Sequence, residues 1–214
     1  MKILDRISEL IYPEKNICFI CDEYEDAIKN HLCIECRDKL EFLEQTISED
    51  IVCPLRYTDG IREIIFKYKY GKNPYLYKML GPLLLEEFIK RNINDIDLIV
   101  PIPMTRRKKS KRGFNQSELL AKYLSEKLNI ELDTRNLVKF KKTKSQSGLS
   151  KSFRRVNIRR AFKIIDKEIF ADKNVLIVDD IITTGATYTE AKRNIMDANA
   201  KKTYLITIAS GRDI

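Results

Sequence analysis

Thirteen residues in the C-terminal part of the chain combine the groups that a phosphate-bearing ligand needs. Residues 175–187 read VLIVDDIITTGAT: four apolar residues, two acids, and a turn rich in threonine and glycine. In a covered parallel sheet ligands bind beyond the carboxyl ends of the strands, where Asp179 and Asp180 would lie. Gly185 permits a backbone conformation that other residues resist, and N–H groups at a helix start favour an anion. A sugar phosphate fits this pattern, with the acids facing hydroxyls or a metal.

The same stretch excludes one class of site and leaves an ordinary alternative open. It lacks the GxxxxGK[ST] lysine, so it is not a nucleoside triphosphate P-loop. The alternative is a strand followed by an acidic helix start that binds nothing. The chain has one histidine, His31, which lies two residues before Cys33. A Ser-His-Asp or Cys-His catalytic centre is therefore not expected.

Four of the five cysteines form two CxxC pairs separated by eleven residues. Each pair directs two thiolates at one centre, and two pairs complete the tetrahedron that a structural zinc ion prefers. Disulfides are the weaker explanation in a cytosolic chain. His31 could replace one ligand but is expected on the surface nearby, and Cys53 is expected to fill the core of a strand. The predicted zinc ligands are Cys18, Cys21, Cys33 and Cys36.

Positive charge is concentrated in one quarter of the chain. The formal net charge is +9, yet residues 105–163 hold 19 basic and 4 acidic residues, and residues 1–55 hold 6 basic and 13 acidic ones. This density favours a polyanionic partner, although many lysine-rich runs are merely solvated. Phe114, Phe153 and Phe162 could stack bases beside the cations, and Phe114 could equally anchor the next helix. The candidate nucleic-acid ligands are Arg106, Arg107, Lys108, Lys109, Lys111 and Arg112.

The elements that must position these groups alternate between strands and helices. Such alternation after residue 50 predicts an α/β fold with a mostly parallel sheet flanked by helices, preceded by the small cysteine module. The predicted domains are 1–50 and 51–214. Residues 141–160 have little apolar content and predict a long mobile loop. The predicted strands are 50–58, 97–103, 175–179 and 203–209, and the predicted helices are 61–70, 75–92 (with Pro82 at a start or kink), 115–129 and 187–199.

Taken together, these motifs resemble a known family. VLIVDDIITTGAT is similar to the phosphoribosyl-pyrophosphate (PRPP) signature of type I phosphoribosyltransferases. The two CxxC pairs, DLIVPIP (97–103) with KRGFNQSELLA (111–121), and SQSGLSKSFRRVNIRRAF (145–162) resemble the ComF family of competence-associated phosphoribosyltransferase-like proteins. The PRPP signature alone identifies only the superfamily, whereas the other segments make the resemblance specific. It runs from the first CxxC to the end of the chain.

The resemblance implies roles for individual residues. It places Asp179 and Asp180 at the ribose 2′ and 3′ hydroxyls, and residues 141–160 in a loop that closes over PRPP. Expulsion of pyrophosphate from ribose builds negative charge on the leaving group, so Mg²⁺ and the loop cations Lys144, Arg154 and Arg155 suit that side. We count Arg154 and Arg155 with the two acids as candidate catalytic residues. The remaining implied PRPP contacts are Pro101, Ile102, Pro103, Thr183, Thr184, Gly185, Ala186 and Thr187.

Three functions remain open at the level of sequence. The first is a ComF-family protein that binds PRPP and single-stranded DNA in DNA uptake and natural transformation, with helicase or channel proteins of the uptake machinery as partners. The second is a salvage phosphoribosyltransferase that joins PRPP to a nucleobase, and the third is a non-catalytic PRPP sensor. Acids in MKILDRISEL argue against a signal peptide, and no apolar run is long enough for a membrane span, so a cytoplasmic location is expected. The sequence does not indicate an acceptor or an oligomeric state.

Overall fold

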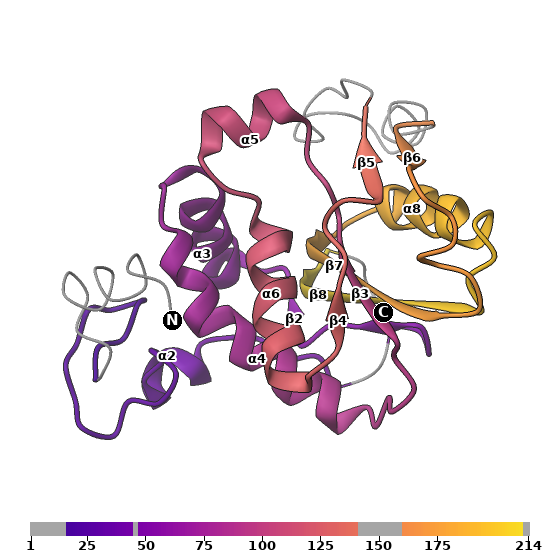
Figure 1. Cartoon of the computed structure of the whole chain (residues 1–214). Coiled ribbons are helices and arrows are strands. Elements are labelled where there is room, and N and C mark those ends of the chain that lie inside the picture. Colours follow the sequence, from indigo (N-terminus) through magenta and orange to yellow (C-terminus); the bar gives the residue numbers. More distant parts are fainter. Residues whose placement is uncertain (1–15, 45–46, 141–159, 212–214) are drawn as a thin grey trace.

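The computed structural model describes residues 16–44, 47–140 and 160–211 (Figure 1). Its centre is a parallel sheet in the order β1–β8–β7–β3–β4, with β2 also paired to β8. Residues 175–178 of β7 are fully buried because strands cover both edges and helices cover both faces. The strands are β1 (Ile51–Val52), β2 (Leu55–Arg56), β3 (Leu98–Pro101), β4 (Glu131–Leu132), β7 (Asn174–Ile182) and β8 (Lys202–Ser210).

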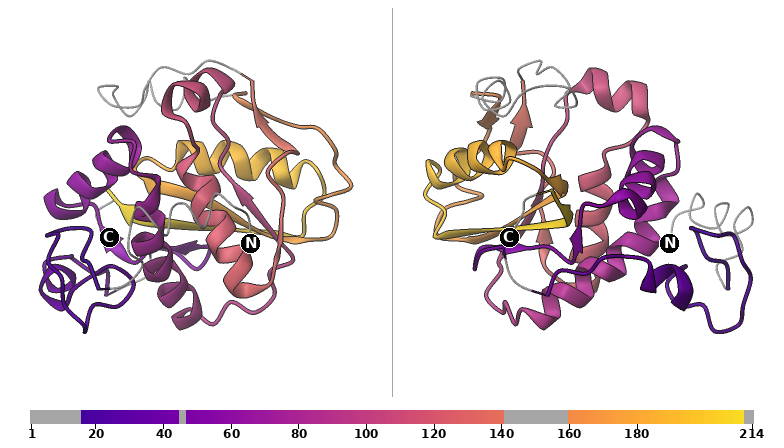
Figure 2. Two further views of the ribbon diagram at one scale, coloured as in Figure 1. Left: turned by 60° about the vertical axis from the view of Figure 1, so that its left-hand side comes forward. Right: turned by 180° about the vertical axis from the view of Figure 1, so that it is seen from behind.

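Helices cover the two faces of the sheet unequally (Figures 1 and 2). On one face, side chains from three helices pack with Leu176 and Val178 in one buried cluster: α3 (Asp59–Tyr70), α4 (Tyr77–Lys90) and α6 (Gln116–Leu128). On the other face, α8 (Ala186–Met196) packs on Val175 and Ile177. Among the described residues, no helix is both long and apolar enough to cross a membrane.

Two further elements stand at the carboxyl end of β3. The helix α5 (Arg106–Arg112) contains the basic run, and it ends at Gly113 in the left-handed conformation. An antiparallel pair, β5 (Leu137–Lys139) and β6 (Phe162–Ile164), lies beside it (Figure 1). This pair brings together the two ends of the segment 141–159, which lies outside the described residues.

The cysteine module packs against α4, on the face of the sheet that α3, α4 and α6 cover. Its short helix α2 (Ile34–Asp38) begins after Cys33 and contributes Cys36 to the same buried cluster as Leu80 of α4. Arg37 forms an ion pair with Glu86 at 2.7 Å. The module is therefore held by both apolar and ionic contacts to α4.

The predicted fold class is confirmed, with corrections to individual elements. The predicted strand 50–58 is two short strands, because Pro54 between them has no N–H to donate to a ladder. The helix predicted for 75–92 begins as a 3-10 turn, Pro74–Leu76, and Pro82 lies inside α4 rather than at its start. The helix α5 and the β5–β6 pair were not predicted, since a run of cations and three-residue strands carry no apolar period.

A close approach between α4 and α6 yields a test of the packing. A Cβ atom added to Gly81 would lie 2.6 Å from Cδ1 and 2.8 Å from Cγ of Tyr123, distances that force the ring or the helix to move. We expect Gly81→Ala to destabilise the protein by about 1–3 kcal/mol in denaturant unfolding, despite the higher helix propensity of alanine. Gly60→Ala is the matched control, because its Cβ would meet only the Lys39 carbonyl oxygen at 3.8 Å. Equal effects of the two substitutions would contradict this packing.

Candidate functional site

Two acids end the buried part of β7 and are held by neighbouring elements. The Asp179 carboxylate accepts hydrogen bonds from Ser117 Oγ at 3.1 Å and from its neighbour's backbone N–H at 2.9 Å. Asp180 forms an ion pair with Lys69 Nζ at 2.9 Å, and both side chains are largely buried. Lys69 lies in the last turn of α3 and Ser117 in the first turn of α6. Two helices thus fix the two carboxylates.

Burial and mutual repulsion change the acidity of this pair. Burial, together with the negative charge of Asp180, raises the pKa of Asp179 to about 7. The positive charge of Lys69 and the hydrogen bond from Ser117 oppose this rise. Such a carboxyl group can take up or release a proton near neutral pH.

The threonine-rich turn follows the acids and begins α8. Gly185 has φ 73°, a left-handed conformation that costs glycine little, and it directly precedes the helix. Thr184 Oγ1 accepts a hydrogen bond from the N–H of Ala186 at 3.4 Å. Thr189 N–H donates to the Gly185 carbonyl oxygen at 2.8 Å, which closes the first turn. The helix start therefore lies next to the two acids, where its N–H groups favour an anion.

Residues 115–117 hold the end of β3 beside this turn. Pro101 pairs in register with Val178, so the segment 101–103 lies next to the acids. Asn115 Nδ2 donates to the carbonyl oxygen of Ile102 at 3.0 Å, and Gln116 Nε2 donates to that of Tyr68 at 3.2 Å. All three polar residues at 115–117 are buried. They explain why a polar FNQS stretch opens an otherwise amphipathic helix.

A cavity of about 810 Å³ opens beside this end of the sheet, between α5 and the β5–β6 pair. Neither acid lines it, but Lys139 does, and its ammonium group is near enough to Asp179 to interact electrostatically. Burial, together with the positive charge of Lys108, lowers the pKa of Lys139 to about 8. Five of the six candidate nucleic-acid ligands line the cavity: Arg106, Arg107, Lys108, Lys109 and Lys111.

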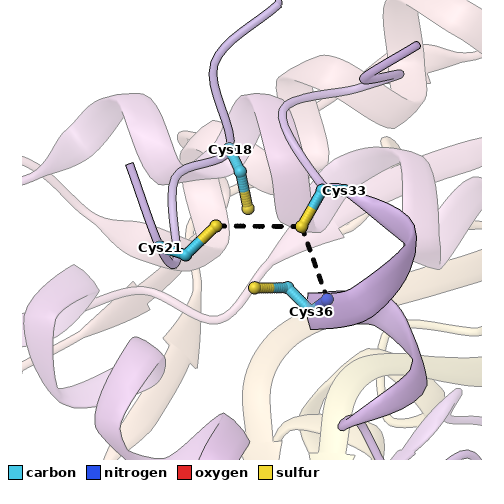
Figure 3. Close-up of side chains that lie close together, drawn as sticks. All are labelled: Cys18, Cys21, Cys33 and Cys36. Carbon is cyan, nitrogen blue, oxygen red and sulfur yellow. Dashed lines mark hydrogen bonds between the residues drawn. The ribbon is translucent and has the colours of Figure 1, made fainter. Parts of the chain in front are cut away.

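The four predicted metal ligands come together in the cysteine module (Figure 3). The Sγ atoms of Cys18, Cys21, Cys33 and Cys36 all lie within 4.8 Å of one another. Those of Cys21 and Cys33 are 3.8 Å apart, and the Cys33 sulfur accepts the N–H of Cys36 at 3.4 Å. His31 is not in this group, and its ring stacks on Phe19 at 4.0 Å. Four sulfurs at these distances can hold a metal ion.

Other candidates from the sequence have different places. Phe162 is buried and cannot stack a base, so that suggestion was wrong. Phe114 packs on the core with its ring 5.9 Å from that of Tyr68, which makes it a helix anchor. Cys53 is buried in the core as predicted. Arg154 and Arg155, with Lys144 and Phe153, lie outside the described residues.

Sequence reasoning missed several residues that shape the site. Lys69 is one more cation in a lysine-rich helix, and no local pattern connects it to Asp180. Ser117 and Asn115 belong to a quoted motif, but their partners lie on other elements. Buried polar residues at a helix start were the available signal, because such groups need hydrogen-bond partners. Lys139 belongs to the basic region recognised from the sequence, but nothing indicated its burial, which arises from the unpredicted β5–β6 pair.

Because its pKa is raised, the ionised carboxylate of Asp179 is expected to lower the folding stability of the protein at neutral and higher pH. Its folded pKa lies above the unfolded value, so the carboxyl group favours folding when protonated, and this contribution is lost as pH rises toward 7. We expect Asp179→Asn to raise the melting temperature at pH 8 and to have little effect near pH 4. An unchanged or lower melting temperature at pH 8 would contradict this.

Asp50 provides the opposite control for that experiment. Despite its burial, hydrogen bonds from Ser48, Lys192 and Tyr188 lower the pKa of Asp50 to about 2. Its contribution to stability is therefore present above the unfolded pKa and is lost as pH falls toward 2. Asp50→Asn should lower the melting temperature at pH 8.

Comparisons with known proteins place these features in a family. Residues 114–213 match the family described as phosphoribosyl transferase domain. Competence protein F of Haemophilus influenzae is 30% identical over 190 residues, covering 81% of this chain and 82% of that protein. DNA utilization protein YhgH of Escherichia coli is 31% identical over 138 residues, which are 63% of this chain but only 60% of that protein.

A solved structure shares part of the chain at lower similarity. The glutamine PRPP amidotransferase from B. subtilis is 18% identical, covers 64% of this chain and 26% of its own, and has a TM-score of 0.42. The match to competence protein F spans most of both chains. The chain belongs to the ComF family, within the type I phosphoribosyltransferase superfamily.

Proposed function

We propose that this protein binds PRPP with Mg²⁺, and single-stranded DNA, and that it acts in DNA uptake during natural transformation. The observation that carries the proposal is the adjacency of two largely buried acids, a helix-start turn and a cation-lined cavity at one end of the sheet. The names of the relatives, Competence protein F and DNA utilization protein YhgH, support the DNA part. On this proposal the protein is cytoplasmic, and its further partners are helicase or channel proteins of the uptake machinery.

The PRPP part assigns separate jobs to neighbouring groups. Asp179 and Asp180 would accept hydrogen bonds from the ribose hydroxyls, and residues 183–187 would surround the 5-phosphate. Residues 101–103 would lie along the pyrophosphate, within reach of the cations that line the cavity. To bind ribose, the Asp180 carboxylate must either contact Lys69 and a ribose hydroxyl together or break its ion pair with Lys69. Lys69 is thus positioned to restore neutrality at the acids when the site holds no sugar.

Mg²⁺ would bind the pyrophosphate oxygens, since hard oxygen ligands suit it and it is commonly held with substrate phosphates. When bound, the ion would offset part of the negative charge that builds on the leaving pyrophosphate. Arg154 and Arg155 are proposed to approach the same charge from the segment 141–159. Transfer to an acceptor would make the protein a phosphoribosyltransferase, but the proposal requires only binding.

The proposal includes a division of the chain and a structural zinc ion. Residues 1–50 would form the zinc-binding module, and residues 51–214 the phosphoribosyltransferase-like domain. Zinc fits the cysteine cluster because four thiolates suit a closed tetrahedral site, without an open position for catalysis. Burial raises the pKa of the Cys36 thiol, and a divalent cation would reverse that effect by favouring the thiolate.

Calorimetry with PRPP and Mg²⁺ tests the central part of the proposal. We expect saturable binding at one site per chain, which Asp180→Asn weakens at least tenfold because it removes the negative charge and replaces one acceptor oxygen with an NH2 donor. Glu86→Gln is a matched control, since its carboxylate pairs with Arg37 far from the acids in the sequence and on the module side of α4. Titration with oligo-dT present shows whether both ligands bind together. Absence of PRPP binding at any concentration tested would refute this function.

Elemental analysis tests the zinc proposal. We expect one zinc ion per chain in protein purified under reducing conditions, and its loss in Cys36→Ser together with lower thermal stability. Cys53→Ala controls for the general loss of a thiol and should keep its zinc, because Cys53 lies in the other core cluster. A folded, reduced and metal-free protein would rule the site out.

A further inference from the structure

One face of α3 carries exposed aromatic rings that no role assigned so far explains. Arg62, Phe66 and Tyr70 recur every four residues and so lie along one stripe of the helix. Phe66 is 61% exposed and Tyr70 is 55% exposed, and their ring centroids are 5.0 Å apart. The opposite face of α3, with Ile61 and Tyr68, is buried in the core. The two rings are therefore not needed to hold the helix in place.

A cation connects this stripe to the basic helix α5. The guanidinium carbon of Arg112 lies 4.9 Å from the centroid of the Tyr70 ring, and its Nη1 donates to Gln116 Oε1 at 2.7 Å. The cation–π contact and the hydrogen bond hold Arg112 between α3 and α6, at the end of α5. Figures 1 and 2 show α3 and α5 as neighbours at one end of the molecule. The aromatic stripe is thus continuous with the cations of α5.

The chemistry of this combined surface suits a single-stranded nucleic acid. Exposed aromatic faces stack unpaired bases of any sequence, and flanking arginines and lysines pair with phosphates. Of the aromatic residues near the basic run, Phe162 is buried and Phe114 is partly buried against the core, whereas Phe140 is 58% exposed beside the cavity. The pair on α3 adds two exposed rings in contact with each other on the other side of α5. Charge complementarity favours a polyanion over an apolar protein partner, because Arg112 stands at the Tyr70 end of the stripe and the cations of α5 continue from it.

We propose that Phe66 and Tyr70 form a base-stacking platform, on which a single strand lies before its backbone continues along α5. This inference rests on the proposed function and adds a defined binding site to it. The platform shares the last turn of α3 with Lys69, which holds Asp180. A strand on the platform therefore passes beside the sugar-phosphate site rather than on a remote surface.

A tryptophan reporter tests the stacking directly, because the natural chain contains no tryptophan. Phe66→Trp keeps an aromatic ring at the platform and introduces a single tryptophan, whose fluorescence can be excited selectively. We expect oligo-dT to quench this fluorescence in proportion to binding, whereas an abasic oligonucleotide of equal length, with phosphates but no bases, should leave it nearly unchanged. Tyr24→Trp, at another exposed aromatic position, should show no quenching by either.

Affinity measurements with matched variants separate the platform from the cations. We expect Phe66→Ala and Tyr70→Ala each to weaken oligo-dT binding about tenfold, with the salt dependence of binding unchanged. Charge reversal at Lys108 and Lys111 should instead reduce both affinity and salt dependence. Tyr24→Ala should leave the affinity unchanged, and thermal unfolding checks that every variant is folded.

The outcomes distinguish this inference from the function on which it rests. Normal oligo-dT binding by the α3 alanine variants, together with weakened binding by the α5 variant, would overturn the platform and keep the DNA function. No oligo-dT binding by the unaltered protein, even at low salt, would overturn both. Quenching that depends on bases, with tenfold losses at each ring, supports the platform.

Discussion

The burial of β7 is the constraint on which the rest of the site depends. Its apolar residues, 175–178, are covered on both faces and both edges, and its pairing with β3 ends at Val178, directly before the acids. The two acids at that rim must then stand close together and partly out of water. Their repulsion is opposed by Lys69 and Ser117, which come from different helices. The packing of α3 and α6 is thus also the electrostatic support of the acids.

The same two helices connect surfaces that have different chemistry. At the start of α6, the capping residue Asn115 donates to the end of β3 and Gln116 donates to Tyr68 of α3. The last turn of α3 has Lys69 on its inner side and exposed aromatic rings on its outer side. A change at the acids therefore has a short structural path to the proposed nucleic-acid surface. If binding at the acids and binding at the nucleic-acid surface are coupled, each ligand would change the affinity of the other by the same factor.

Local patterns were enough to predict some features but not others. The central strand, the turn at Gly185 and the four cysteines follow from short motifs whose geometry is nearly independent of context. Contacts such as Lys69 with Asp180 connect distant parts of the chain, so no local pattern announces them. The basic run was recognised by its charge, but its helical form was not. The exposed rings of α3 were hidden within an ordinary amphipathic helix, because a ring's exposure depends on what packs beside it.

A structure of the protein with PRPP and Mg²⁺ tests the account most directly. We predict the ribose 2′ and 3′ hydroxyls within hydrogen-bond distance of Asp179 and Asp180, and the 5-phosphate within the turn at 183–187. We also predict that Lys69 lies farther from Asp180 than its present 2.9 Å, or shares that carboxylate with the sugar. A ligand bound elsewhere, with the acids still paired only to Lys69 and Ser117, would contradict the account.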